Sequence, residues 1–179
     1  MSRWLVVLVC VAWSAGHAAG AVVRDVAYKS GNGLSAYEVE RCKLDLYLPE
    51  GAEDFATLVW FHGGGLKEGS KADPMTVGIA KWFAEHGAAV ALPNYRLSPR
   101  ATYPSYVDDA AASAAWVRRN IASHGGDAEK VFVSGHSAGG YLTAMVGLDG
   151  RWLGRYGLDA GAMAGLIPVS GQMVTHSTV

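Results

Sequence analysis

Short apolar segments alternate with longer amphipathic ones, and this alternation constrains the fold more than any other feature. Residues 57–61 and 88–92 read as buried strands, and residues 130–134 and 166–170 as two further strands. Between them, residues 75–86, 104–124 and 137–147 read as helices, with glycine close after each. Strands that alternate with helices form a parallel sheet covered by helices. We therefore predict one α/β domain with a mostly parallel central sheet.

Two further strands precede this pattern, over residues 22–28 and 42–48. The second alternates leucine with Lys43, Asp45 and Tyr47, which predicts an antiparallel strand with one exposed face. A glycine-containing turn at residues 29–35 separates the two. They predict an antiparallel N-terminal edge on the sheet.

The first 21 residues have the three-part pattern of a secretory signal peptide. Arg3 is their only charge, ten uncharged residues follow from Trp4, and Ala19-Gly20-Ala21 offers a small-residue cleavage site. We predict cleavage near Ala21, a mature domain over residues 22–179, and a secreted or periplasmic protein without stable membrane insertion. An uncleaved membrane anchor is the alternative.

Charge and cysteine content narrow the function classes. The chain has 15 basic and 16 acidic residues and no basic block, which argues against a nucleic-acid partner. Cleavage removes Cys10 and leaves Cys42 alone, where burial is the ordinary fate. The sequence contains neither H-E-x-x-H nor C-x-x-C, so we expect no metal and no cofactor.

A G-x-S-x-G motif at residues 135–139 falls between a predicted strand and a predicted helix. Glycines allow the sharp turn that exposes Ser137 at the helix N-terminus, and the N–H of Ala138 then faces a developing oxyanion. A chain of this composition would contain the motif by chance about 0.2 times, so the motif alone is weak evidence. Its position between a strand and a helix is the stronger indication of a nucleophile.

A second motif, His62 followed by three glycines, comes directly after the strand at residues 57–61. Glycines let the backbone approach a ligand, so the amides of Gly64 and Gly65 are candidate oxyanion donors and His62 a structural pin for the loop. An ordinary turn is the alternative. A phosphate loop is disfavoured, because Gly69-Ser70-Lys71 reverses the order that this motif needs.

Together the motifs HGGG, YRL, DD and GHSAGG resemble those of the α/β-hydrolase superfamily, over about residues 39–170. The resemblance is closest to hormone-sensitive-lipase-like carboxylesterases and their feruloyl- or acetyl-esterase-like relatives. It implies Ser137 as the nucleophile, with Gly64, Gly65 and Ala138 as oxyanion donors. It also implies a small-molecule ester as substrate, and structural roles for Arg96, Asp108 and Asp109.

The sequence departs from this family after the nucleophile. The family places its acid and then its histidine after the serine, but here only Asp149, Asp159 and His176 follow. We interpret all three as ordinary residues, the acid and base of the triad as absent from this chain, and the fold as partial, with its last strands missing. An exposed, aggregation-prone sheet edge near residues 166–169 follows from that.

Two alternatives to ester hydrolysis stay open. One is a non-catalytic binding or interaction module on a degenerate hydrolase scaffold. The other is amide or peptide hydrolysis on the same scaffold. The oligomeric state is left open by the sequence.

Overall fold

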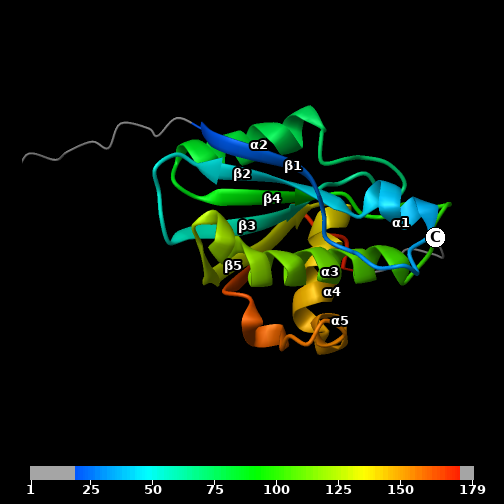
Figure 1. Cartoon of the computed structure of the whole chain (residues 1–179). Helices are drawn as coiled ribbons and strands as arrows, with labels where there is room; N and C mark the ends of the chain where they lie inside the picture. The colour runs from blue at the N-terminus through cyan, green and yellow to red at the C-terminus, as the bar shows by residue number, and fades with distance from the viewer. Residues whose placement is uncertain (1–18, 174–179) are drawn as a thin grey trace, which may run out of the picture.

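The computed structural model describes residues 19–173, in which six strands form one mixed sheet (Figure 1). The strand order is β1-β2-β4-β3-β5-β6. The pairs β1–β2 and β2–β4 are antiparallel, and β3–β4, β3–β5 and β5–β6 are parallel. The α/β fold and its antiparallel N-terminal edge are thus confirmed. The strands are β1 (Ala19–Ala27), β2 (Lys43–Pro49), β3 (Phe55–Phe61), β4 (Ala89–Pro93), β5 (Gly126–His136) and β6 (Gly165–Val169).

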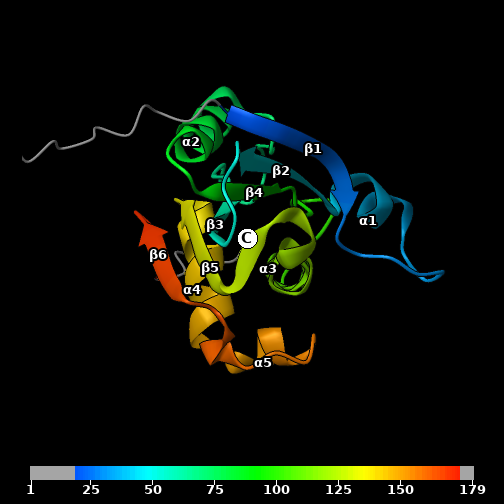
Figure 2. The same ribbon diagram turned by 60° about the vertical axis from the view of Figure 1, so that its left-hand side comes forward.

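Helices cover both faces of the sheet, as Figure 2 shows. On one face α2 packs over β1, β2 and β4, and on the other α3 and α4 pack over β3 and β5, with α4 reaching β6. Each face has its own apolar core, the larger one under α3 and α4. The helices are α1 (Ala36–Arg41), α2 (Pro74–Glu85), α3 (Ser105–Asn120), α4 (Ala138–Leu148) and α5 (Gly150–Gly154), with 3-10 turns η1 (Ile121–His124) and η2 (Ala160–Ala162).

One prediction about β2 is wrong: the strand is not half-exposed. Asp45 and Tyr47 are almost fully buried, like the leucines that point to the other face. Tyr47 joins the apolar core under α2. Asp45 is buried because Lys71 and Arg24 pair with it, at 2.6 and 3.2 Å. Asp45 and Tyr47 are therefore internal, Lys43 is partly buried, and β1 forms the outer edge.

The N-terminal prediction falls mostly outside the described residues. Residues 1–18 are not described, and β1 begins at Ala19, so its first three residues precede the predicted mature start at Val22. None of the helices described over residues 19–173 is long and apolar enough to cross a bilayer. Cys42 is buried and free, as predicted.

Strand β6 forms the other edge of the described sheet. Ile167 and Val169 keep 52% and 36% of their surface exposed, as the sequence predicted for this region. The Val169 carbonyl accepts a hydrogen bond from Ser137, so the backbone of Pro168 faces the outer edge. A proline there has no N–H to offer a further strand, which reduces the tendency of this edge to pair with other chains. Aggregation through this edge stays a prediction.

Candidate active site

Ser137 lies in a strained turn between β5 and α4. Its backbone has φ 56° and ψ −114°, which a residue with a side chain adopts only where the surroundings impose it. The Ser137 N–H donates to the Val169 carbonyl at 3.0 Å, and its own carbonyl accepts from Tyr141 at 3.0 Å. The turn therefore holds the serine between β6 and the first turn of α4.

The glycines of the motif allow this turn to press against the end of β3. A Cβ on Gly139 would lie 2.1 Å from the Phe61 carbonyl oxygen, and one on Gly135 would lie 2.6 Å from the same oxygen. Real Cβ atoms do not approach that closely. Both positions therefore require glycine, and the turn is fixed relative to the chain that follows Phe61.

That chain is the glycine loop, and it runs beside Ser137. A Cβ on Gly63 would lie 3.6 Å from the Ser137 Cβ. Gly64 and Gly65 have φ values of 110° and 61°. Within residues 19–173, the amides of Gly64, Gly65 and Ala138 donate no hydrogen bond. These three amides are thus available to a ligand.

His62 anchors the loop from beneath, as predicted. Its Nδ1 lies 2.7 Å from the Gly63 carbonyl oxygen, so Nδ1 is the donor in this hydrogen bond. Its ring stacks on Tyr95 at 4.2 Å, and the Tyr95 hydroxyl donates to the His62 carbonyl at 2.7 Å. Burial lowers the pKa of His62 to about 4, which keeps the ring neutral at physiological pH.

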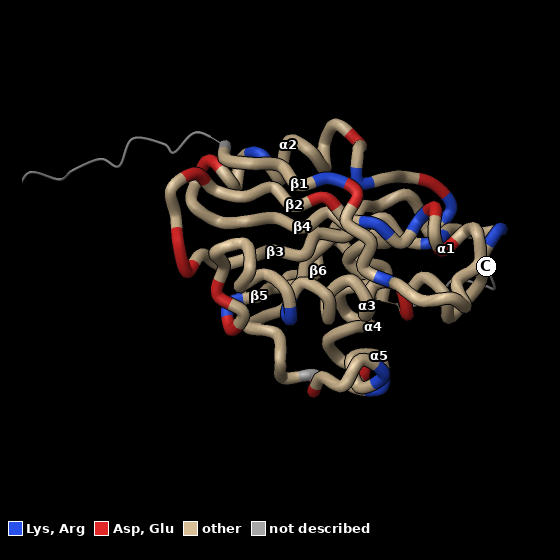
Figure 3. Tube along the Cα trace, viewed as in Figure 1, with Lys and Arg blue, Asp and Glu red and all other residues tan. Residues whose placement is uncertain are grey.

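A buried ion cluster supports the loop that carries Tyr95. Asp109 is fully buried, and its carboxylate accepts from the Arg96 guanidinium at 2.7 and 2.8 Å and from Lys29 at 2.7 Å. Lys29 also pairs with Asp108 at 2.6 Å. Figure 3 shows basic and acidic residues side by side in this region around α1. The structural roles implied for Arg96, Asp108 and Asp109 are confirmed by these contacts.

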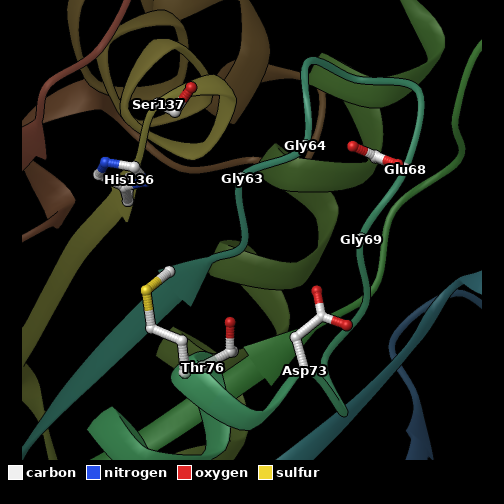
Figure 4. A pocket seen from close by; sticks show the side chains of 9 residues that line it. Gly63, Gly64, Glu68, Gly69, Asp73, Thr76, His136 and Ser137 are labelled. Atoms are coloured by element: carbon white, nitrogen blue, oxygen red, sulfur yellow. The ribbon is translucent and has the colours of Figure 1, made fainter.

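A cavity of about 440 Å³ opens between Ser137 and the start of α2 (Figure 4). The side chain of His136 was expected to point away from the hydroxyl and to pack. It does point away in Figure 4, but it is half-buried and lines the cavity. The lining residues are Gly63, Gly64, Glu68, Gly69, Asp73, Met75, Thr76, His136 and Ser137.

The acidic residues after Ser137 have structural partners. Asp149 caps α5 and pairs with Arg151, which lowers the pKa of its carboxyl to about 2. Asp159 caps η2 through the Gly161 amide at 2.8 Å. His176 lies outside the described residues. Over residues 19–173, no group of three or more His, Cys, Asp or Glu residues is arranged to hold a metal ion.

Comparison with known proteins places this geometry among esterases. The BD-FAE family model matches residues 44–154, more than half of the chain. The probable isoprenylcysteine alpha-carbonyl methylesterase ICMEL1 of Oryza sativa is 38% identical over 60% of this chain and 25% of its own length. Carboxylesterase NlhH of Mycobacterium tuberculosis is 33% identical over 57% of this chain and 32% of its own. The chain thus spans about a quarter to a third of the length of these curated relatives.

Solved structures of esterases also resemble this chain. The hyperthermophilic esterase of Pyrobaculum calidifontis aligns with a TM-score of 0.64 and 28% identity, over 82% of this chain and 44% of its own. Esterase B of Lactobacillus rhamnosis aligns with a TM-score of 0.65 and 25% identity, over 78% of this chain and 44% of its own.

Proposed function

The chain belongs to the BD-FAE family of α/β-hydrolases, and from this membership we propose that it carries the nucleophile and oxyanion hole of a serine hydrolase acting on small carboxylic esters. The relatives and solved structures described above are esterases, which favours esters over amides and peptides. The observation that carries the proposal is the strained Ser137 beside a glycine loop with unbonded amides.

In the proposed reaction the Ser137 Oγ attacks the ester carbonyl carbon. The carbonyl oxygen becomes an oxyanion, which accepts hydrogen bonds from the amides of Gly64, Gly65 and Ala138. Collapse of this intermediate expels the alcohol and leaves an acyl-serine, which water then hydrolyses. Loss of one donor from such a hole typically costs about 3 kcal/mol of barrier stabilisation.

The serine also needs a base and an acid that orients the base. We assign neither role to a described residue. Asp149 and Asp159 serve as helix caps, and the ring of His136 points away from the Ser137 hydroxyl. Turnover by this chain alone is therefore expected to be low. Phosphonylation of Ser137 also needs an activated hydroxyl, so probe labelling tests as well whether a base acts on it from outside residues 19–173.

A fluorophosphonate probe tests the proposal. We expect the full chain to be labelled on Ser137, as read by mass spectrometry of the peptide, and Ser137→Ala to abolish labelling. Ser123→Ala is the matched control, because Ser123 is an exposed serine on η1. No labelling at Ser137 would support the second candidate, a binding module on a degenerate hydrolase scaffold.

We also propose that the protein is exported with cleavage near Ala21, giving a secreted or periplasmic enzyme. The sequence pattern of residues 1–21 supports this. N-terminal sequencing of the protein from the periplasm or medium should give a start near Val22. An intact Met1 on protein recovered from membranes would favour the anchor instead.

A further inference from the structure

The cavity beside Ser137 has one polar wall, built by the loop after Gly64 and by the start of α2. Glu68, Asp73 and Thr76 supply its functional groups (Figure 4). No lysine or arginine is among the residues that line the cavity in the described part of the chain. The wall therefore carries negative charge. The Arg41 guanidinium donates to the carbonyl of the lining residue Gly69 at 3.2 Å but is not itself among the residues that line the cavity.

Glu68 is the free charge of this wall. It is exposed, and its carboxylate makes no ion pair and accepts no hydrogen bond over residues 19–173. The side chain lies against Gly64, because a Cβ on Gly64 would be 3.2 Å from the Glu68 Cγ. In Figure 4 its carboxylate points into the space beside Gly64.

Asp73 is the fixed charge. Its carboxylate accepts from the Ser70 amide at 2.8 Å and from the Ser70 hydroxyl at 3.1 Å, which holds it at the N-terminus of α2. The nearby Lys71 does not neutralise it, because its ammonium pairs with Asp45 at 2.6 Å and with Asp25 at 3.0 Å.

Thr76 is the independent sign of a ligand. It is only 2% exposed, yet its hydroxyl forms no hydrogen bond within the described residues and points into the cavity in Figure 4. The hydroxyl oxygen is open to the cavity, so only water or a ligand there can be its partner. A ligand with polar groups at this wall would supply that partner.

We propose that this wall determines specificity: it favours esters that present a hydrogen-bond-donating group, an ammonium or a hydroxyl, and rejects esters that present a carboxylate or phosphate. The inference rests on the proposed function, since it concerns the same cavity. A charge several ångströms from a carboxylate at a partly solvated surface changes affinity by about tenfold.

Binding of hydrolysis-resistant ketones tests this without requiring turnover. The ketones are analogues of one butyrate ester, alike except for a terminal ammonium, hydroxyl, methyl or carboxylate group. Titration calorimetry of the full chain at low salt should rank ammonium and hydroxyl above methyl, and methyl above carboxylate. We expect about tenfold between ammonium and methyl. Glu68→Gln should reduce this ratio. Adding Asp73→Asn should abolish it, since asparagine removes the charge but keeps an oxygen that can accept from the Ser70 amide.

Glu53→Gln is the matched control, because Glu53 is an exposed acid that does not line the cavity. Equal affinities for all four ketones, no binding at millimolar concentration, or the same effect from Glu53→Gln would overturn the inference. Probe labelling of Ser137 separates the two proposals. If Ser137 is labelled but the ketones bind without a charge preference, only the specificity proposal is wrong. If the ketones show the charge preference but Ser137 is not labelled, only the proposed role of Ser137 as nucleophile is wrong.

Discussion

Neutralising Asp109 should destabilise the whole domain. Its carboxylate has no exposed surface and accepts four hydrogen bonds, one from Lys29 and three from the amide and guanidinium of Arg96, between 2.7 and 2.9 Å. In Asp109→Asn the donors stay in place but lose their counter-charge. The Lys29 and Arg96 side chains are only 10% and 14% exposed, so water cannot replace the carboxylate.

Removing one partner of a buried ion pair typically costs about 3 to 5 kcal/mol. Glu38 and Asp108 remain near the two cations, so we take the lower figure, about 3 kcal/mol, for the loss in free energy of unfolding. Glu40→Gln is the matched control. Glu40 pairs with Arg100 and both side chains are more than half exposed, so its loss should stay below about 0.5 kcal/mol.

Urea unfolding followed by tryptophan fluorescence measures both variants at one pH and salt concentration. An unchanged m-value with a lower midpoint for Asp109→Asn would show that the native state lost stability. A loss below about 1 kcal/mol, or one equal to that of Glu40→Gln, would refute the reasoning, because the cluster would then behave as a surface pair.

Three other predictions concern buried groups. The pKa of His62 is 6.5 in the unfolded chain and about 4 in the fold, so the unfolded state binds more protons between these pH values. The free energy of unfolding should therefore drop by about 3 kcal/mol as the pH falls from 6.5 to 4. Urea unfolding at a series of pH values should show this dependence, and His62→Asn should remove most of it. Gly139→Ala should lower the melting temperature because its Cβ meets the Phe61 carbonyl, whereas Gly78→Ala, in open space inside α2, should raise it; equal shifts in calorimetry would contradict the packing. Burial raises the pKa of Cys42 to about 12, so iodoacetamide at pH 8 should leave this thiol unmodified in the folded chain and alkylate it in urea. Rapid alkylation of the folded chain would contradict this prediction, because the thiol would then be accessible to the reagent.

The central strands β3 and β4 were predictable because they are buried on both faces. An apolar run such as residues 57–61 needs no information from elsewhere in the chain to be identified as an internal strand. The misjudged strand was β2, where burial of Asp45 depends on Lys71, 26 residues away. Helix α1 was missed although Ser35 and Glu38 form a capping box, a signal that the sequence does contain.

In the candidate site too, the locally determined part was predictable and the part formed by distant residues was not. The turn at Ser137 is local, so glycine spacing alone located it, and its conformation follows from steric contacts with neighbouring backbone. The cavity wall was not predicted. Glu68 and Thr76 line the same cavity because the chain turns back after Gly64, whose carbonyl accepts hydrogen bonds from the amides of Lys67 and Glu68. No short sequence motif indicates that these residues line one cavity.

The strain at Ser137 explains why so many contacts converge around it. Backbone in such a region costs about 1 to 3 kcal/mol and persists only where the surroundings fix it. Here β6 supplies the Val169 carbonyl to the Ser137 amide, and β3 supplies the surface on which Gly139 rests. The glycine loop is held by the stack of His62 on Tyr95, and the loop of Tyr95 is held by the Arg96–Asp109 pair. The buried charges thus act on the serine only through the backbone that they position, which is why neutralising one should slow probe labelling of Ser137 even in molecules that stay folded.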